Sequence, residues 1–386
     1  MKIVHLCLAS FFPDGYAYQE NLLPRFHKQL GYDVEVIASR ATFDEYGKPA
    51  LYEGVRQYKN EYDIPVTRLD YKKPIKVFKK MRRYVGTIKA IELANPDILF
   101  IHGCQFMDMD LVVKYLKNRQ NVRVYVDNHA DFSNSATNWL SKSVLHKIIW
   151  KRCAQIIEPY TYKFYGVLPA RVDFLVDIYN LPRQKCELLV MGADDDQVIK
   201  SKKTNARGNI RKQYSIKDDD FLILTGGKID KWKTQTLLLM EAVKGIDDER
   251  VKLIIFGSVT QELSERVHAL ADGVKVQYIG WIQSQESYNY IEAADLVVFP
   301  GRHSVLWEQT TGQGKPMLVK DWEGTHHVDM GGNVIFLKKD SVGEMRTIIE
   351  TLLSDRTRLR KMQEVAETKG MKAFSYREIS KRSVSS

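Results

Sequence analysis

The feature that most constrains this chain is the alternation of short apolar runs with longer amphipathic stretches. Most of the runs are continuously apolar, as in strands whose two faces are both covered. The stretches between them are long enough for helices, which predicts repeated βα units and parallel sheets. The expected strands lie at residues 2–9, 34–38, 97–102, 122–128, 187–190, 221–225, 252–256, 275–279, 296–299, 316–320 and 333–337.

The length of 386 residues predicts two domains. A polar, charge-dense stretch at residues 192–220 suits a connection between them with one amphipathic turn or helix. We therefore expect domains at 1–192 and 193–370, followed by a tail at 371–386 that ends in small polar residues and frays. Doubly wound domains of this kind bind ligands at the carboxyl ends of their strands.

Composition excludes several classes of protein. The 58 Lys+Arg against 48 Asp+Glu give a net charge of +10, which favours an anionic partner. Nucleic acid is not the expected one, because aromatic residues are not interleaved with the basic runs. The four cysteines are scattered without a CxxC pair, so neither a disulfide framework nor a zinc site is expected. This pattern predicts that the protein works in a reducing cytoplasm. No signal peptide or membrane-spanning run is expected.

Two lysines follow the strand expected at 221–225. Gly226 and Gly227 end this run, and Lys228 and Lys233 come next, before an amphipathic stretch. A glycine turn lets backbone N–H groups approach an anion, and two lysines at that turn would neutralise a diphosphate. The alternative is that both lysines are solvated loop residues.

A carboxylate follows the strand expected at 296–299. Glu308 lies in a helix-like segment that ends near Gly312. It could accept the two hydroxyls of a ribose, as acidic residues do in other nucleotide sites. The alternative is an exposed helical glutamate.

Together, these motifs resemble the C-terminal domain of retaining glycosyltransferases of family 4. The shared order is a strand with GG-K-x4-K, then FGS, VQYIGWI, ADLVVFP and finally E with GKPMLV, over roughly residues 220–340. The resemblance implies the GT-B fold, an α/β architecture of two Rossmann-like, doubly wound parallel-sheet domains facing a central cleft. It implies that Lys228 and Lys233 hold the donor diphosphate, that Glu308 holds the ribose, and that Gly280, Trp281 and Ile282 line the base.

The sequence departs from the family in the loop before Glu308. Pro300 stands where the family has its first glutamate, and the loop is several residues short. Arg302, His303 and Ser304 occupy this space and are candidates for part of its role toward the donor sugar. One extra residue also separates Glu308 from Pro316, so Gln309 is the alternative that is strictly in register.

The first half resembles the family less closely. Its opening strand, loop and helix match, although only Gly15 remains of the usual two glycines, and Gly15 and Tyr16 are assigned to the acceptor side with His102. The resemblance implies that His129, at the end of the strand expected at 122–128, contacts the transferred sugar. A histidine at a strand end is otherwise more often structural.

Two possible metal motifs are set aside. Asp108 and Asp110 form a D-x-D pattern that belongs to the other large glycosyltransferase fold. His326 and His327 with Asp329 show no closed set of ligands. Neither a metal nor a cofactor is expected.

One basic segment, at residues 72–90, predicts contact with a membrane surface. Ile75, Phe78, Met81 and Val85 are helically spaced opposite a lysine- and arginine-rich face, although a surface helix packed on a core looks similar. Family members that build surface polysaccharide often use lipid-linked acceptors, so a peripheral position on the cytoplasmic face of the cell membrane is expected.

The resemblance implies a metal-independent, retaining hexosyltransferase. It would move a sugar from a nucleotide diphosphate sugar, with UDP favoured, to a hydroxyl of a glycan or lipid-linked acceptor in surface polysaccharide synthesis. The alternatives are a nucleotide-sugar epimerase of GT-B fold and a nucleotide-binding scaffold without catalysis.

Overall fold

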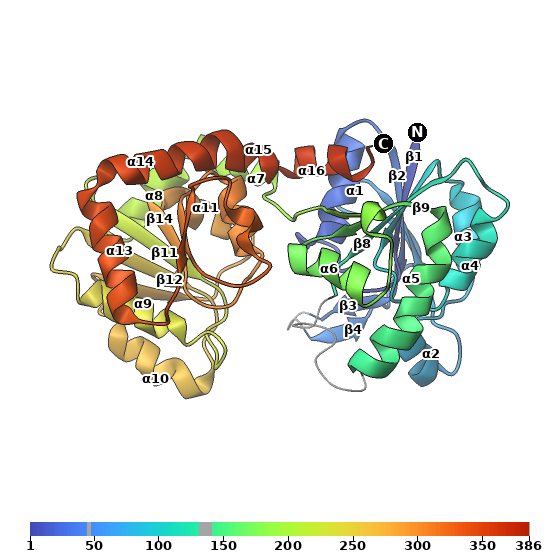
Figure 1. Cartoon of the computed structure of the whole chain (residues 1–386), viewed down its shortest axis with the longest axis horizontal. Coiled ribbons are helices and arrows are strands. Elements are labelled where there is room, and N and C mark those ends of the chain that lie inside the picture. The colour runs from blue at the N-terminus through green and yellow to red at the C-terminus, as the bar shows by residue number, and fades with distance from the viewer. Residues whose placement is uncertain (45–47, 131–140, 386) are drawn as a thin grey trace. The chain divides into compact units, whose positions relative to one another are not determined.

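The computed structural model describes residues 1–44, 48–130 and 141–385 (Figure 1). The chain divides into two compact units. Unit 1 holds Met1–Val190 together with Ile379–Ser386, and unit 2 holds Met191–Glu378. The division falls between residues 190 and 191, where the sequence placed the boundary at 192, and the last residues of the chain return to unit 1.

Unit 1 is built on an eight-stranded sheet in the order β10-β9-β8-β7-β1-β2-β6-β5, parallel except for the antiparallel pair β5–β6. A two-stranded antiparallel sheet, β3–β4, accompanies it. The strands are β1 Lys2–Cys7, β2 Asp33–Ser39, β3 Ala41–Phe43, β4 Pro49–Leu51, β5 Gln57–Lys59, β6 Pro65–Leu69, β7 Ile98–His102, β8 Arg123–Asn128, β9 Thr161–Gly166 and β10 Cys186–Leu188.

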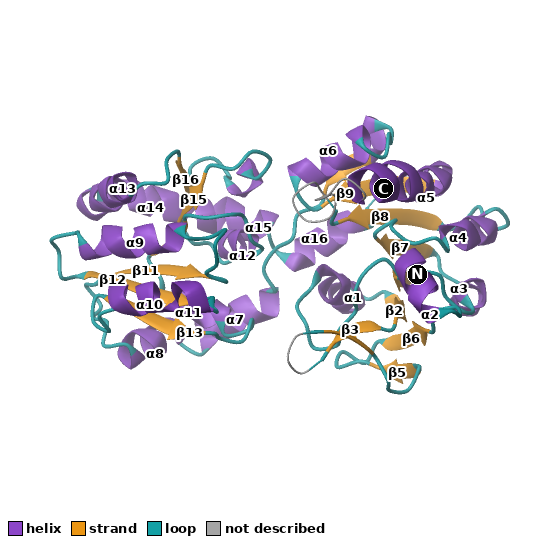
Figure 2. Cartoon of the chain, turned by 90° about the horizontal axis from the view of Figure 1, so that it is seen from below, coloured by secondary structure: helices purple, strands orange, loops and turns teal. Residues whose placement is uncertain are grey.

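Helices connect these strands, as Figure 2 shows. They are α1 Gln19–Gln29, α2 Ile75–Met81, α3 Thr87–Ala94, α4 Met109–Leu116, the π-helical η1 Ser141–Trp150, α5 Lys151–Ile157 and α6 Pro169–Asp177, with short 3₁₀ turns η2 Glu158–Tyr160 and η3 Arg183–Lys185. The expected helical spacing over 72–90 is interrupted. Arg82 adopts a positive φ of 52° directly after α2, and residues Tyr71 and Tyr84 pair across the break.

Unit 2 is built on a six-stranded, fully parallel sheet in the order β13-β12-β11-β14-β15-β16. The strands are β11 Phe221–Gly226, β12 Val251–Phe256, β13 Val276–Gly280, β14 Leu296–Phe299, β15 Met317–Lys320 and β16 Val334–Leu337. All six were expected from sequence. Their central residues are almost wholly buried, which explains why these strands are continuously apolar.

The helices of unit 2 are α7 Asp195–Lys203, α8 Ala206–Gln213, α9 Gln235–Lys244, α10 Gln261–Leu270, α11 Ser287–Ala293, α12 Leu306–Gly312, the 3₁₀ turn η4 His326–Val328, α13 Val342–Ser354, α14 Arg356–Val365, the π-helical η5 Ala366–Gly370 and α15 Met371–Ala373. The stretch at 192–220 thus holds two helices rather than one. Helix α16, Tyr376–Ser383, begins in unit 2, and its last residues pack in unit 1.

The prediction that the tail frays is wrong. Ile379, Ser380 and Ser383 are fully buried, and Val384 is buried as well. Tyr125 of β8 donates a hydrogen bond from its hydroxyl to the carbonyl oxygen of Val384 at 3.1 Å. Ser380 and Ser383 lie among polar groups of the interior, whereas Ser385 is exposed.

The four cysteines are buried and free. The expectation that they form no disulfide framework is therefore confirmed, and each serves as a small apolar side chain.

Candidate functional site

The candidate donor site lies at the carboxyl edge of the unit 2 sheet. Because all six strands are parallel, the loops that leave β11, β13, β14 and β15 start at this one edge. These loops carry the lysines after Gly227, the segment 280–282, the segment 300–305 and the histidines at 326–327. Topology therefore gathers residues that lie up to a hundred positions apart in sequence.

Glycines are required where β11 and β12 end. A Cβ on Gly226 would lie 2.1 Å from the ring of Phe256, and a Cβ on Gly257 would lie 2.0 Å from the carbonyl oxygen of Gly227. Gly227 also adopts a φ of 113°, which L side chains rarely adopt. The N–H of Gly227 donates to the carbonyl of Phe256 at 3.0 Å, so this N–H stabilises the turn instead of facing a ligand.

The two predicted lysines differ in their surroundings. Lys228 is exposed, with Nζ 4.0 Å from a carboxylate oxygen of Asp230. Lys233 is half-buried and lies against both glycine loops: a Cβ on Gly227 would be 3.6 Å from its Nζ, and one on Gly301 would be 3.4 Å from its Cγ. Burial lowers the pKa of Lys233, while Asp230 acts in the opposite direction. Lys233 thus places a partly desolvated cation between the β11 and β14 loops.

Arg302 is held by two tryptophans that sequence reasoning did not single out. Its guanidinium carbon lies 4.4 Å from the ring centre of Trp232 and 5.9 Å from that of Trp322. Both rings are largely exposed, and such cation–π contacts restrict an otherwise mobile side chain. Trp232 could have been singled out from the sequence, because it is a large aromatic residue between two lysines in a polar loop.

Glu308 is enclosed by two histidines. Its Oε1 accepts hydrogen bonds from Nε2 of His303 at 2.8 Å and Nε2 of His327 at 2.9 Å. Glu308 is fully buried, His327 nearly so, and the side chain of His303 is 13% exposed. Burial alone would raise the pKa of Glu308, but the two histidines lower it to about 2. The carboxylate is therefore charged at neutral pH.

Sequence reasoning missed the partnership of Glu308 with His327. The neighbouring His326 turns away and bonds Asp321 instead. The in-register alternative, Gln309, bonds Ser287 and Gln313.

The ligand atoms of His303, Glu308 and His327 lie within 4.8 Å of one another, so these side chains could hold a metal ion. Both nitrogens meet the same oxygen at hydrogen-bond distance, which is the geometry of two N–H donors on one acceptor.

The remaining predicted residues of unit 2 lie on the same edge. Gly280 ends β13, and its carbonyl accepts the N–H of Gly257 at 2.7 Å. Trp281 is 71% exposed, and Ile282 is half-buried. Ser304 accepts the backbone N–H of Trp307 on its carbonyl oxygen. Trp281 is therefore available as an apolar surface for a flat ring.

Two of the candidate residues of unit 1, His102 and His129, lie beside Asp127. Nδ1 of His102 lies 2.7 Å from Oδ2 of Asp127, and Nε2 of His129 lies 3.5 Å from the same oxygen. His102 is buried, whereas the side chain of His129 is 32% exposed. Burial alone would lower the pKa of His129, but Asp127 raises it overall. His129 is therefore the exposed member of this cluster.

Gly15 and Tyr16 lie on the loop that follows β1. The N–H of Gly15, where φ is 75°, donates to Oε1 of Glu61 at 2.9 Å. The ring of Tyr16 packs on those of Tyr18 and Phe43. This loop is thus built from a glycine turn and an aromatic cluster.

The D-x-D pattern is structural. Asp108 is buried and accepts the N–H of Tyr84 at 2.9 Å and the hydroxyl of Thr87 at 2.6 Å. Asp110 pairs with Arg83 at 2.9 Å. Both carboxylates are occupied by the chain's own donors, as expected of a chance match.

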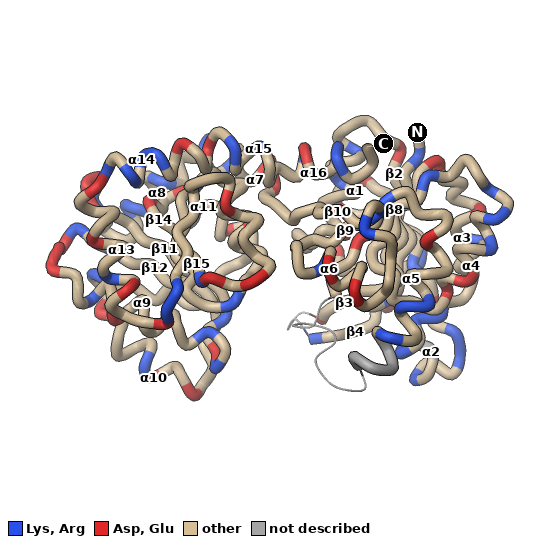
Figure 3. The backbone as a smooth tube through the Cα atoms, in the orientation of Figure 1, with Lys and Arg blue, Asp and Glu red and all other residues tan. Residues whose placement is uncertain are grey.

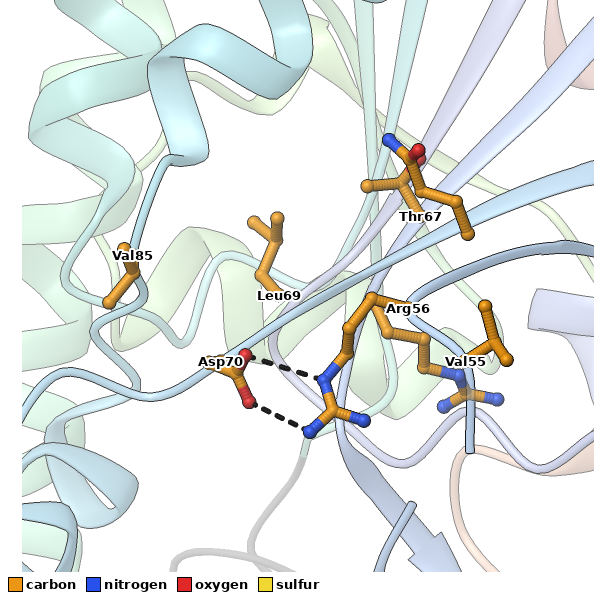
Figure 4. Close-up of a pocket in the computed structure, with 8 residues that line it drawn as sticks. Val55, Arg56, Thr67, Leu69, Asp70 and Val85 are labelled. Carbon is orange, nitrogen blue, oxygen red and sulfur yellow. Dashed lines mark hydrogen bonds and ion pairs between the residues drawn. The ribbon is translucent and has the colours of Figure 1, made fainter. Parts of the chain in front are cut away.

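A hollow of about 520 Å³ lies elsewhere in unit 1, beside β5 and β6 (Figure 4). The ion pair of Arg56 with Asp70, at 3.2 Å, lies within it. Its opposite charges already satisfy each other, and its walls hold none of the predicted site residues. It is therefore not the candidate site.

Comparisons with known proteins bear on the fold and on the family of the second half of the chain. Residues 206–369 match the family model described as Glycosyl transferases group 1. Three solved structures are similar over 99% of the chain at 13–14% identity: Anabaena Alr3699/HepE with UDP (TM-score 0.68, 98% of that chain), WaaG, a glycosyltransferase involved in lipopolysaccharide biosynthesis (0.63, 100%), and the UDP-GlcNAc 2-epimerase of Neisseria meningitidis (0.61, 98%). The chain has the GT-B fold.

A curated relative is also similar. The uncharacterized glycosyltransferase MJ1607 of Methanocaldococcus jannaschii is 22% identical over 152 residues, which is 38% of this chain and 39% of that protein. The match spans about two fifths of the relative's length.

Proposed function

We propose that the protein is a glycosyltransferase that uses a nucleotide diphosphate sugar, with UDP as the favoured nucleotide. The observation that carries this proposal is Lys233, a partly desolvated cation between two glycine loops at the carboxyl edge of the unit 2 sheet. This edge lies within the residues that match the glycosyltransferase family model. The complexes of Alr3699/HepE with UDP and with UDP-glucose support the choice of nucleotide.

In this proposal, Lys228 and Lys233 bind the diphosphate and stabilise the negative charge that develops on it as the sugar leaves. Fixed charges that meet developing charge are often the largest contribution to catalysis. Two cations at this position make a metal ion unnecessary for the leaving group. Trp281 and its neighbours would cover the base.

Glu308 acts in this proposal through His303 rather than by direct contact, because its carboxylate is enclosed. Oε1 fixes the proton of His303 on Nε2, which leaves Nδ1 with a lone pair when the ring is neutral. A hydroxyl of the donor is a suitable partner for that nitrogen. His303 would thus take over part of the role of the family glutamate that Pro300 replaces.

We further propose retention of the anomeric configuration, with the acceptor hydroxyl attacking on the face from which the diphosphate leaves. The departing phosphate would take the proton of the acceptor, and His129 would contact the transferred sugar. A glycan or lipid-linked acceptor in surface polysaccharide synthesis is the proposed second substrate. The lipopolysaccharide role printed for WaaG supports this choice.

The epimerase alternative has one supporting observation. Two similar structures are a UDP-GlcNAc 2-epimerase and a putative one from Listeria monocytogenes. An epimerase would convert its nucleotide sugar without an acceptor, whereas the scaffold alternative would bind a nucleotide without turnover. The family match favours transfer over both.

Nucleotide binding gives the first test of the proposal. Thermal-shift measurements with UDP, GDP and ADP should show stabilisation by one of them, and UDP is expected to give the largest shift. At a nucleotide concentration of a hundred times its Kd, binding should raise the free energy of unfolding by about 2.7 kcal/mol. A melting temperature that none of the three changes would remove the donor site and the proposed function with it.

We also propose that unit 1 contacts an anionic membrane surface through α2. Lys76, Lys79 and Lys80 are exposed on this helix, next to exposed Ile75 and Val77 (Figure 3). The two arginines of the basic segment, Arg82 and Arg83, do not contribute. Arg82 donates to the carbonyl of Gln105 and packs on Trp150, and Arg83 pairs with Asp110. No helix in the described ranges is long and apolar enough to cross a bilayer.

Charge reversal on α2 tests the membrane proposal. Lys79→Glu combined with Lys80→Glu should weaken binding to phosphatidylserine vesicles at least tenfold, because each charge near anionic lipid is worth about 1 kcal/mol. Vesicle sedimentation measures this binding. Lys114→Glu on α4 combined with Lys117→Glu directly after it is the matched control and should bind as the wild type does. Equal loss in both variants would show that only net charge matters.

A further inference from the structure

Arg302 is an exposed cation at the candidate donor site, and its neighbours are rings instead of carboxylates. Its guanidinium carbon lies 4.4 Å from the ring centre of Trp232 and 5.9 Å from that of Trp322. Among the residues that the structure describes, no carboxylate pairs with Arg302 and no acceptor takes a hydrogen bond from its side chain. The charge of Arg302 is therefore left for a partner outside the chain.

Other basic side chains near the same edge of the sheet have partners of their own. Lys320, at the end of β15, pairs with Asp340, and Lys338, directly after β16, pairs with Asp321. An exposed arginine without a carboxylate is ordinary by itself, because surface ion pairs contribute little. What distinguishes Arg302 is that two aromatic rings hold its side chain while its charge stays unmatched.

Both tryptophans are fixed through their backbones. The N–H of Trp232 donates to Oδ1 of Asp230 at 2.9 Å, and the carbonyl oxygen of Trp322 accepts from the hydroxyl of Thr325 at 2.6 Å. A guanidinium over a ring uses its flat face for this contact, which leaves the N–H donors at its edge unoccupied. Arg302 is thus held with a planar fork of donors free for an acceptor.

The diphosphate of the donor does not need this third cation. A nucleoside diphosphate sugar carries one negative charge on each phosphate, and Lys228 and Lys233 match these charges in the proposed function. A Cβ on Gly301 would lie 3.4 Å from Cγ of Lys233, so this loop begins beside the diphosphate cation. Arg302 follows, and next comes His303, which is assigned to a donor hydroxyl. This order along the loop places Arg302 toward the sugar.

We propose that Arg302 selects a donor whose sugar carries a carboxylate, namely a nucleotide-linked hexuronic acid. This inference rests on the proposed function and names the class of its donor. A carboxylate is planar and accepts two parallel N–H bonds from a guanidinium, whereas a phosphate is met equally well by a lysine. A neutral hexose has a hydroxymethyl group at the same position and leaves the charge of Arg302 unmatched.

Matched pairs of donors test the proposal on the full chain. UDP-glucuronate is compared with UDP-glucose, and UDP-galacturonate with UDP-galactose, by isothermal titration calorimetry. In at least one pair, the uronate should bind about tenfold more tightly than the neutral sugar, as expected of a charge-assisted hydrogen bond. Arg302→Ala should abolish this preference and leave the affinity for UDP within about twofold of the wild type.

Two further variants separate the fork of Arg302 from the general charge of the loop. Lys231→Ala removes a neighbouring cation whose Nζ lies 5.2 Å from the ring centre of Trp232, and it should keep the uronate preference. Trp232→Ala releases the guanidinium from its main support, so the preference should fall about threefold while UDP affinity stays unchanged.

The other outcomes contradict the inference in distinguishable ways. A wild type that binds UDP without preferring either uronate would overturn it and leave the donor site in place. A preference that survives Arg302→Ala would put the carboxylate elsewhere, and an equal loss of UDP, neutral sugar and uronate in that variant would put Arg302 on the diphosphate. If UDP itself does not bind, the proposed function fails and the inference fails with it.

Discussion

Lys233→Ala should weaken UDP binding and lower turnover by about a hundredfold, with little change in the free energy of unfolding. The reason is that Lys233 is half-buried between Gly227 and Gly301, where a charge-assisted contact with a phosphate is poorly screened by water. A loss of about 3 kcal/mol corresponds to this factor. Isothermal titration calorimetry measures the affinity for UDP, a transfer assay measures the turnover, and urea unfolding measures the free energy of unfolding.

Lys231 provides the matched control for this experiment. It lies in the same loop, is exposed and packs on Trp232. Lys231→Ala should therefore keep UDP affinity close to that of the wild type, and Lys228→Ala should fall between the two because Lys228 is exposed. Wild-type affinity in Lys233→Ala would remove Lys233 from the donor site. Equal losses in all three variants would indicate a diffuse electrostatic effect.

Glu308→Gln should both destabilise unit 2 and weaken donor binding. At neutral pH, the native carboxylate accepts two hydrogen bonds with a pKa of about 2, against 4.5 for an ordinary glutamate. A group whose folded pKa is depressed stabilises the fold above its unfolded pKa, and this contribution is lost as the pH falls toward the folded value. The variant should thus be less stable by about 2 kcal/mol at pH 7, and the difference should shrink by pH 3. Urea unfolding at both pH values measures it.

Measurements of UDP-sugar binding show whether Glu308 contacts the donor directly or acts on it through His303. If Glu308 works through His303, then His303→Ala and Glu308→Gln should each weaken UDP-sugar binding about tenfold, and the double variant should lose no more than one of them. Gln309→Ala, which disturbs contacts to Ser287 instead, should leave the affinity unchanged. Additive losses would place both side chains on the ligand independently. A loss after dialysis against EDTA would assign His303, Glu308 and His327 to a metal.

The strands were predictable where both faces are covered by apolar side chains. β6 and β9 were missed because their sequences are polar or aromatic. In β6, Arg68 is buried and pairs with Asp14 at 3.2 Å, and in β9, Tyr162 is exposed. A buried arginine depends on partners far along the chain, which no local pattern shows. The same holds for Ser380 and Ser383, whose partner His27 lies more than 350 positions away.

The candidate donor site was predictable in its components but not in its contacts. The lysines, the glycine turn and Glu308 follow from motifs, and parallel topology brings them to one edge. The enclosure of Glu308 by His327 was not predictable, because 19 positions separate them and the contact depends on β15 lying beside β14. Arg302 was named as a candidate, but its stacking on Trp232 depends on where the β11 and β14 loops end.

The most direct test of the central claim is the fate of a UDP-sugar, followed by proton NMR, with and without a lipid-linked or glycan acceptor. The account predicts that UDP is released only when an acceptor is present and that the new glycosidic bond keeps the anomeric configuration of the donor. Conversion of the sugar to its epimer without any acceptor would contradict the account and support the epimerase.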